Sequence, residues 1–280
     1  MATASNAGNQ PAEDTYTLDE ITVADASSLS RTVGGTAVGN FTEWFDFGVY
    51  SYVVVYISQV FFPADAKWGT VATFAGLAVS FLVRPIGGIF WGALGDRIGR
   101  KKILAYTVLL MAVGTFCLGL VPGYASIGIG APILLFALRG VQGFSTGGEY
   151  VGAMTFLVEH SPDKRRGFLL SWLPVGTLSG YILGALLVFI MQVSLSPEAM
   201  VSWGWRVPFL CAGPLGLVGL YVRLHLEESP AYENEQASGG HGMDKKSGLQ
   251  QLRETVRGQG KPLMICMGLV LSFNVTNYML

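Results

Sequence analysis

The sequence predicts an all-α membrane protein, with a bundle of six crossing helices, a polar linker and the start of a seventh helix. Three observations support this fold class. Seven apolar runs, each near or above the ~20 residues that a helix needs to cross the hydrocarbon, follow one another along the chain. Only 13% of the residues are charged, against roughly 25% in soluble domains. Lys and Arg are concentrated in alternate loops, as in membrane proteins with a fixed orientation.

Polar segments divide the chain into four parts. Residues 1–30 carry acidic residues but no Lys or Arg, and we expect a disordered cytoplasmic tail. Residues 31–226 hold six apolar runs, and residues 227–260 form a polar central cytoplasmic loop. Residues 261–280 are apolar to the last position, and we expect them to be the truncated start of a second bundle. The seven runs are 33–62, 70–94, 103–122, 130–158, 168–191, 205–226 and 262–280.

The loops between the runs fall into two sets that differ in basic charge. The first set comprises residues 63–67, 122–130 and 192–203, and the second comprises residues 96–102, 162–166 and 227–261. The first set contains Lys67 as its only basic residue, whereas the second contains twelve Lys and Arg. Because cytoplasmic loops carry the Lys and Arg excess, these counts predict a cytoplasmic amino terminus and a cytoplasmic second set.

The first run carries two carboxylates at helical spacing. Glu43 and Asp46 are three residues apart and share a helix face with Asn40. A carboxylate inside a bilayer is costly unless it is paired or faces water or the bundle interior. We interpret this face as a proton-carrying site. The alternative is that it lies near an aqueous mouth, where the acids are solvated.

The second run contains a lone arginine, Arg84, directly before Pro85, where a helix can bend and free a backbone carbonyl. We interpret Arg84 as a partner for Glu43 or Asp46, or as an anchor for a substrate carboxylate. The third run, residues 103–122, starts immediately after a short basic segment that ends the second.

The fourth run places several polar residues on one face. Successive residues of a helix turn by about 100°, which gathers a cation, two amide or carboxylate groups and a phenol into one sector. In a lipid-facing helix this stripe would be expensive, so it is expected to face a cavity or polar partners. Glu149 could instead belong to an interhelical ion pair, and Arg139 could bind backbone carbonyls. The polar members are Arg139, Gln142, Thr146, Glu149 and Tyr150.

The fifth run repeats Gly176, Gly180 and Gly184 every four residues, a spacing that lets helices approach closely. The sixth run begins after Trp203. Among the aromatic residues, Trp44 and Trp172 could bind a quaternary ammonium by cation–π attraction, although each could equally serve in packing or as an interfacial anchor.

Several motifs together resemble the metabolite:proton symporters of the major facilitator superfamily, and in particular the bacterial proline/glycine-betaine osmoprotectant carriers. Relatives in this group carry α-ketoglutarate, citrate or shikimate. The motifs are residues 40–47, 84–88, 92–102, 139–150, 161–167, 203–209, 226–231 and 274–280.

The resemblance implies two six-helix bundles, each built from two inverted three-helix repeats, and alternating access driven by the proton gradient. It places Arg139 in proton coupling. It also assigns the loop after the second run to a cytoplasmic gate that makes and breaks charge contacts between helix ends. The gate residues are Gly92, Gly95, Asp96, Arg97, Gly99 and Arg100.

The function expected from the sequence is proton-coupled symport of a small zwitterion across the bacterial cytoplasmic membrane. A carboxylate or dicarboxylate substrate is the alternative, as is a membrane protein without transport, such as an inactive half-transporter. We expect no enzyme activity, cofactor, metal or nucleic-acid partner, because the chain has no Walker loop and no Cys/His cluster. The expected partners are lipid, substrate, protons and a missing second bundle. Without that bundle, Glu43, Arg84, Arg139 and Glu149 should lie on an open surface.

Overall fold

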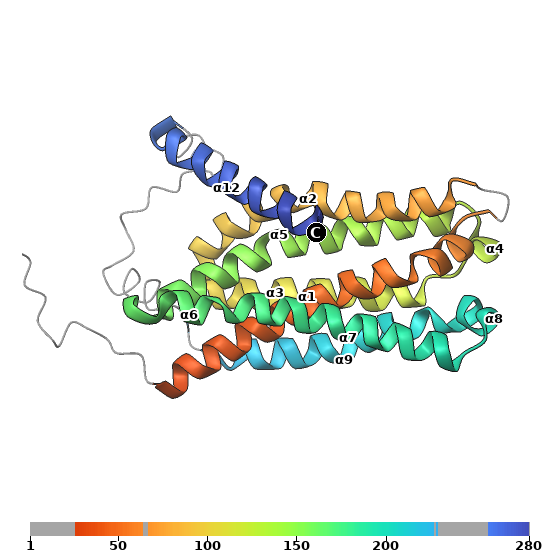
Figure 1. Ribbon diagram of the computed structural model, residues 1–280, viewed down its shortest axis with the longest axis horizontal. Coiled ribbons are helices and arrows are strands. Elements are labelled where there is room, and N and C mark those ends of the chain that lie inside the picture. Colours follow the sequence, from red (N-terminus) through yellow and green to blue (C-terminus); the bar gives the residue numbers. More distant parts are fainter. Residues whose placement is uncertain (1–25, 64–66, 227, 229–256, 280) are drawn as a thin grey trace, which may run out of the picture.

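The computed structural model describes residues 26–63, 67–226, 228 and 257–279. All regular structure in these ranges is helical, and six long helices lie side by side in one bundle (Figure 1). The long helices are α1 (Ala26–Phe61), α2 (Gly69–Ile98), α3 (Arg100–Leu120), α5 (Gly130–His160), α7 (Trp172–Ser194) and α9 (Arg206–Leu224). Short turns between them are α4 (Tyr124–Ile127), η2 (Asp163–Arg165), α6 (Arg166–Leu170), α8 (Pro197–Ala199) and η3 (Met200–Gly204).

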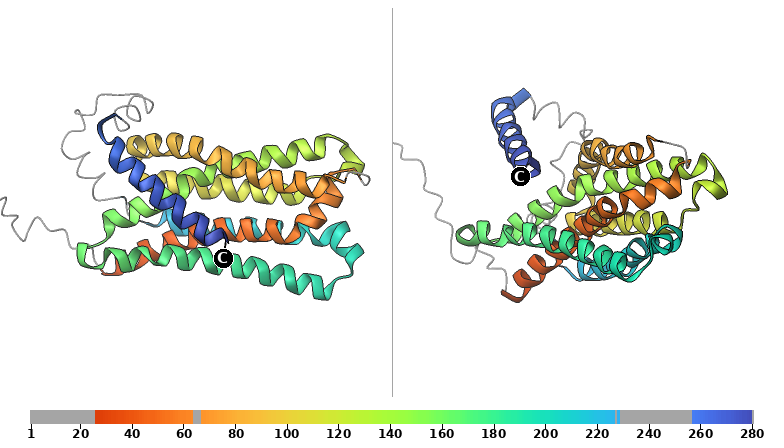
Figure 2. Two further views of the ribbon diagram at one scale, coloured as in Figure 1. Left: turned by 45° about the horizontal axis from the view of Figure 1, so that its top comes forward. Right: turned by 45° about the vertical axis from the view of Figure 1, so that its right-hand side comes forward.

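The last helix, α12 (Gly260–Met279), stands apart from this bundle in the right-hand view of Figure 2. Its apolar side chains are exposed, from Met264 at 69% to Leu271 at 67%. The predicted seventh helix is therefore present, and it buries little of its surface against the other six.

The helices match the predicted apolar runs, with one correction at the start. The first helix begins at Ala26, so residues 26–30 are helical and not part of a disordered tail. The physical reason is that an apolar run marks only the part of a helix that crosses hydrocarbon, whereas helical hydrogen bonding continues into a polar flank. The remainder of the predicted tail, residues 1–25, and residues 229–256 of the predicted central loop lie outside the described residues.

Within the part of the chain that the structure describes, four helical segments are long and apolar enough to cross a membrane: α2, α3, α6 with α7, and α9. The other two long helices, α1 and α5, have 36 and 31 residues. At a 1.5 Å rise per residue they extend ~54 Å and ~46 Å, which also exceeds the hydrocarbon thickness. These two helices carry most of the buried polar residues, and this lowers their hydropathy.

The helices pack in pairs that relate the two halves of the bundle. The closest pairs are α1 with α7, α2 with α5, and α3 with α9. Suppose that α5, α7 and α9 form a second copy of the repeat α1, α2 and α3. Exchanging the two repeats then converts the pair α1 with α7 into the pair α5 with α2. The pair α3 with α9 is converted into itself. The pairing is thus the one expected for two three-helix repeats, as predicted.

Glycines set the close approach within the pairs. A Cβ atom on Gly143 or Gly147 of α5 would collide with the backbone carbonyl of Ser80 or Arg84 on α2. The glycines that repeat every four residues on α7 likewise lie against the backbone of α1 between Ala37 and Val49. The predicted packing role of these small residues is confirmed, because any larger side chain would separate the helix axes.

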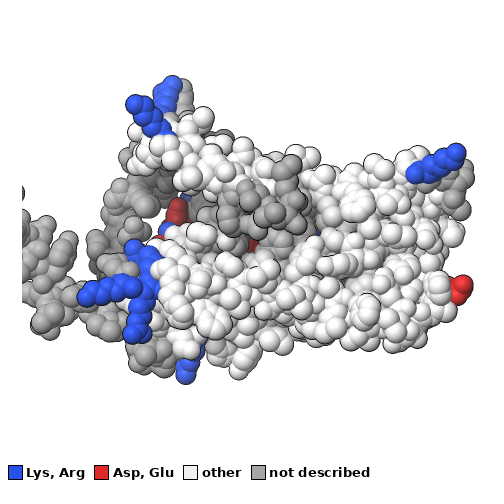
Figure 3. Space-filling model, viewed as in Figure 1, with Lys and Arg blue, Asp and Glu red and all other residues white. Residues whose placement is uncertain are grey.

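The two ends of the bundle differ in charge. Figure 3 shows Lys and Arg side chains gathered at the end where α6 lies, and few at the end formed by α4 and α8. The basic end holds Arg97, Arg100, Lys101, Lys102, Lys164, Arg165 and Arg166. Among the described residues, the basic loops 96–102 and 162–166 therefore lie at the opposite end of the bundle from the loops 122–130 and 192–203.

Two hydrophobic clusters fill the bundle and leave a polar layer between them. The first lies toward α4 and α8 and includes Val53, Phe61 and Trp205. The second lies toward α6 and includes Phe156 and Leu173. The buried polar residues Asn40 and Glu43 of α1, Thr107 and Thr115 of α3, and Arg139 to Glu149 of α5 fall between members of the two clusters along their helices. This places the polar layer roughly midway along the bundle.

Candidate functional site

The polar layer is built mainly by α1 and α5, which cross in the centre of the bundle. Asn40, Glu43 and Asp46 of α1 are each at most 3% exposed. Arg139, Gln142, Thr146 and Glu149 of α5 are equally buried, as the predicted polar face requires. The structure therefore brings together the candidate residues of the first and fourth runs. It leaves Tyr150 only partly buried at the edge.

Glu43 forms an ion pair with Arg84 of α2. The distance from Arg84 Nη2 to Glu43 Oε1 is 3.0 Å. The guanidinium carbon lies 4.6 Å from the ring centroid of Phe47 and 4.7 Å from that of Phe81. Arg84 is thus held between two aromatic rings and one carboxylate.

Asp46 takes a different partner. The hydroxyl of Thr115 on α3 donates to Asp46 Oδ2. Gln142 Nε2 in turn donates to Thr115 Oγ1 over 2.6 Å. The second oxygens of Asp46 and Glu43 are buried without a hydrogen-bond partner. A buried oxygen in this state needs a proton or a ligand donor, so both acids are equipped to exchange one.

Arg139 lies over an aromatic ring. Its guanidinium carbon is 3.6 Å from the ring centroid of Tyr50, whose hydroxyl donates to the carbonyl of Thr73 over 2.7 Å. The Nε and Nη2 atoms of Arg139 are buried and have no hydrogen-bond partner. This second cation therefore has free donors, and the ring beneath it, Tyr50, lies one helical turn after Asp46 on α1.

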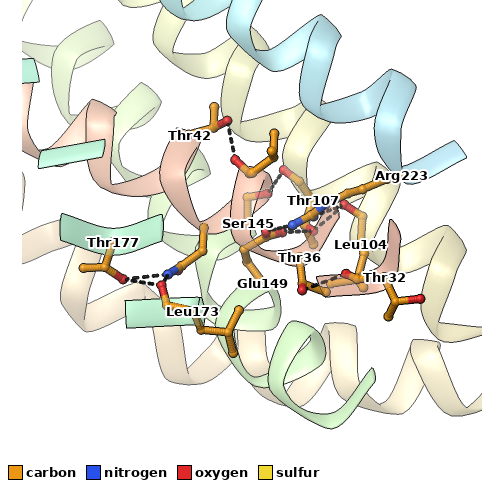
Figure 4. Close-up of polar contacts among 12 residues, drawn as sticks. Thr32, Thr36, Thr42, Leu104, Thr107, Ser145, Glu149, Leu173, Thr177 and Arg223 are labelled. Carbon is orange, nitrogen blue, oxygen red and sulfur yellow. Dashed lines mark hydrogen bonds and ion pairs between the residues drawn. The ribbon is translucent and has the colours of Figure 1, made fainter. Parts of the chain in front are cut away.

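Both carboxylate oxygens of Glu149 accept hydrogen bonds from side chains of α9 and α3 (Figure 4). Arg223 of α9 donates to both of its oxygens, with 2.7 Å from Nη1 to Oε2 and a second bond from Nη2 to Oε1. Thr107 of α3 also donates to Oε2, over 2.6 Å, and Arg223 Nη1 donates to the carbonyl of Leu104. The interhelical ion pair, one of the two roles predicted for Glu149, is thus formed.

The ion pair between Arg223 and Glu149 also lies against α1, which explains why α1 has a glycine at that point. A Cβ atom on Gly39 would overlap the guanidinium of Arg223. Four helices, α1, α3, α5 and α9, therefore meet at one buried guanidinium, whose side chain is 0% exposed.

Asn40 and the two candidate tryptophans lie at the contact between α1 and α7. Asn40 Nδ2 donates to the carbonyl of Leu173 and to Thr177 Oγ1, both over 2.6 Å. Trp44 packs 6.3 Å from Tyr181 between ring centroids. Trp172 lies nine residues before Tyr181, roughly 13 Å away along the helix, and is 44% exposed. The structure therefore does not bring the tryptophans together in one aromatic site.

The predicted gate residues lie at the basic end of the bundle. Arg100 Nη1 is 2.9 Å from Glu159 Oε1 at the end of α5, and Arg100 Nη2 is 3.8 Å from Asp96 Oδ1. Gly99 joins α2 to α3 with φ of 100°, which favours glycine. Gly92, Gly95, Asp96 and Arg100 line a groove of about 170 Å³ between α2 and α5.

Sequence reasoning missed four residues of the polar layer: Tyr50, Thr107, Thr115 and Arg223. Arg223 could have been found, because it is an ionisable residue within an apolar run, as Arg84 and Arg139 are. The hydroxyl residues could not be identified in the same way, because Thr and Ser are common in membrane helices, where they can form hydrogen bonds within their own helix.

The prediction that these charged residues lie on an open surface is wrong. Glu43, Arg139 and Glu149 are each 1% exposed, and the Arg84 side chain is 21% exposed. The reason is that each has partners within the same six helices, which the sequence could not reveal. The first bundle buries its own charges.

Comparison with known proteins extends these observations. The model of the family described as sugar (and other) transporters matches residues 33–261. The chain is 47% identical over 268 residues to the glycine betaine/proline/ectoine/pipecolic acid transporter OusA of Dickeya dadantii, covering 94% of this chain and 53% of the relative. It is 46% identical over 270 residues to the proline/betaine transporter of Salmonella typhimurium, covering 94% and 54%. The chain thus spans about half the length of the curated relatives it matches.

Solved structures share the fold. The proton:xylose symporter XylE superposes with a TM-score of 0.68 at 19% identity, covering 86% of this chain and 56% of that one. An inward-open structure of XylE from E. coli gives a TM-score of 0.65 at 21% identity, covering 87% and 60%. The helical bundle, the family match and the relatives agree with the resemblance found in the motifs. This chain is a member of the family described as sugar (and other) transporters, and its fold is shared with the XylE structures.

Proposed function

We propose that this chain forms the first half of a proton-coupled symporter for a small zwitterionic osmolyte, such as proline or glycine betaine. Transport proceeds by alternating access of a site between two bundles. The proton gradient supplies the energy, and no cofactor takes part. The most similar relatives named above are transporters of proline and betaine.

The observation that carries the proposal is the pair of buried acids on α1. Glu43 and Asp46 lie midway along the bundle, and each has one oxygen without a partner and a cation nearby. An ionisable group buried in a membrane helix marks an ion or proton pathway by default. A carboxylate beside an arginine can hold a proton in one state and an ion pair in the other.

The charge balance of the polar layer favours a zwitterion over the alternative, a carboxylate or dicarboxylate. Within the described residues the layer contains three acids, Glu43, Asp46 and Glu149, and three arginines, Arg84, Arg139 and Arg223. A substrate with net negative charge would need an excess of positive charge, whereas a zwitterion leaves a neutral layer neutral.

The proposed location is the cytoplasmic membrane of a bacterium, with the basic end of the bundle and the amino terminus in the cytoplasm. The segregation of Lys and Arg to one end supports this orientation.

The test uses a full-length transporter that carries these 280 residues as its first half. Uptake of radiolabelled glycine betaine into liposomes is driven by an imposed pH gradient. We expect Glu43→Gln and Arg139→Ala to abolish accumulation. The control is Glu198→Gln, the same chemical change at an exposed carboxylate of α8. Accumulation unchanged by both substitutions would assign these residues to packing. Gradient-driven uptake of a dicarboxylate in place of betaine would favour the alternative substrate.

A further inference from the structure

Arg84 is held in a fixed position but is only partly satisfied. The two phenyl rings of Phe47 and Phe81 flank its guanidinium, and Glu43 Oε1 contacts its Nη2 atom. Its Nε atom is buried and has no hydrogen-bond partner. In a guanidinium, Nε–H and Nη2–H point to the same edge, and this edge matches the two oxygens of a carboxylate. Glu43 occupies half of it with one oxygen.

The residues around this guanidinium differ in how exposed they are. Phe81 is 42% exposed and the Arg84 side chain is 21% exposed, whereas Glu43 is 1% exposed. Part of the Arg84 side chain is therefore exposed beside Phe81, while Glu43 is buried behind it. Glu43 Oε2, like Arg84 Nε, lacks a partner. The contact is a single-point ion pair in which both members keep an unused group.

We infer that the carboxylate of the transported zwitterion binds this edge of Arg84, displaces Glu43, and thereby causes Glu43 to take up a proton. The inference rests on the proposed function and adds the coupling step to it. The exchange balances in charge. One carboxylate replaces another at the same guanidinium, and the displaced carboxylate becomes neutral by binding a proton from solution. A quaternary or secondary ammonium elsewhere on the substrate takes no part in this step.

Displacement leads to protonation because, among the described residues, no other cation is free to replace Arg84. The charged or titratable groups around Glu43 are Asp46 on its own helix, Glu149 and Tyr150 on α5, and Arg223 on α9. Arg223 is bound through two nitrogens to Glu149 and is not free to move to Glu43. A buried carboxylate without a counterion is costly, so the neutral acid is the stable form once Arg84 has turned to the substrate.

The remaining helices add no competing charge. Trp172–Ser194 of α7 contains no charged residue, and α3 contains none after Lys102. Arg139 of α5 lies over the Tyr50 ring, toward Asp46. Glu43 and the substrate therefore compete for one guanidinium.

This competition predicts a reciprocal effect. If substrate binding favours the proton on Glu43, then a proton on Glu43 must favour substrate binding by the same factor. Glu43→Gln imitates the protonated acid permanently. We expect it to bind glycine betaine more tightly than the wild type at pH 8, by about fivefold or more, the low end of ordinary coupling between linked sites. The gain should vanish for choline, which has the same cation but no carboxylate.

The experiment measures equilibrium binding of radiolabelled glycine betaine and choline to the purified full-length transporter at pH 6 and pH 8. Glu198→Gln serves as the control, and Arg84→Gln should lose betaine binding by at least tenfold, the factor that one charged hydrogen bond of ~1.4 kcal/mol provides. Unchanged or weaker betaine binding in Glu43→Gln would overturn the inference, as would an equal gain for choline.

The wild type gives a second test that needs no substitution. Glycine betaine added to the transporter in weakly buffered solution should cause proton uptake, and choline should not. Absence of uptake with betaine would contradict the inference even if Glu43→Gln failed to fold. Failure of the proposed function looks different, because the wild type would then show no betaine accumulation under a pH gradient.

Discussion

At the scale of single residues, the buried acids fall into two kinds. Glu149 has both oxygens engaged by Arg223 and Thr107. Glu43 has one oxygen without a partner and meets its arginine through a single contact. An ion pair whose oxygens are all bonded has no free atom for a ligand, whereas an ion pair with an unbonded oxygen can accept a further donor. We therefore expect Glu149 to fasten helices together and Glu43 to take part in the chemistry.

The first prediction separates these roles. Glu149→Leu and Arg223→Met should each lower the stability of the full-length transporter by about 3–5 kcal/mol, because each leaves a buried charge without its partner. The double substitution should recover most of the loss, since it removes both charges together. Thermal unfolding in detergent measures the effect. A double variant no more stable than the single variants would show that the pair is not an independent unit.

At the scale of helices, the crossing of α2 and α5 positions the site. Gly147 lies against the backbone carbonyl of Arg84, and Gly143 lies against that of Ser80. Ser80 adds a hydrogen bond from its hydroxyl to the Arg139 carbonyl, over 2.8 Å. The same backbone contact that joins the two helices therefore fixes the depth of Arg84 beside Glu43. The crossing of α2 and α5 thus determines both the packing of these helices and the position of Arg84 in the site.

The second prediction tests that crossing. Gly147→Ala should destabilise the protein by about 1–3 kcal/mol, because the new methyl group forces the two backbones apart. Betaine uptake should fall with it, as Arg84 moves. Gly140→Ala, on the same helix, is a matched control, because its Cβ atom would have no neighbour closer than 4.0 Å. That variant should be unchanged or more stable by up to ~1 kcal/mol. Equal effects of both substitutions on thermal unfolding would refute a specific role for the crossing.

At the scale of the whole molecule, the bundle has a basic end and a nearly uncharged end. Contacts at the basic end join different helices, for example Arg100 with Glu159, and the backbone amide of Lys101 with Glu228 Oε1 over 3.0 Å. In the transporter that we propose, these contacts lie within one of two bundles, and movement of one bundle against the other requires both.

The third prediction concerns orientation. A cysteine introduced at Gln192 should react in intact cells with a reagent that cannot cross the membrane, and a cysteine at Lys164 should react only after permeabilisation. Both positions are exposed, at opposite ends of the bundle. Cys117, Cys211 and Cys266 are replaced first, so that they give no background. Labelling of position 164 from outside intact cells would reverse the proposed topology.

The fourth prediction concerns the 280 residues by themselves. We expect them not to transport, because alternating access needs a site enclosed between two repeats and this chain supplies one bundle. The measurement is reconstitution of the purified chain beside a version extended by a second bundle. Saturable, uncoupler-sensitive uptake of betaine by the 280 residues alone would contradict this expectation and would imply that two copies work together.

The sequence by itself determined the helices, the division of the loops into a basic and a nearly uncharged set, and the chemical types of the polar layer. These properties depend on local composition and on the helical period, so they can be counted along the chain. Glu43, Asp46 and Arg139 were identified because each is an ionisable residue inside an apolar run. The same rule would have found Arg223, had it been applied to the end of the sixth run.

Only the tertiary structure decided which residues meet. Arg84 pairs with Glu43 and not with Asp46, Asp46 takes Thr115, and Glu149 takes Arg223 across 74 residues. Spacing along one helix fixes which side chains share a face, but not which helix lies opposite or at what height. That register is set by backbone contacts at glycines such as Gly147 and Gly180, and these contacts exist only once the helices have packed.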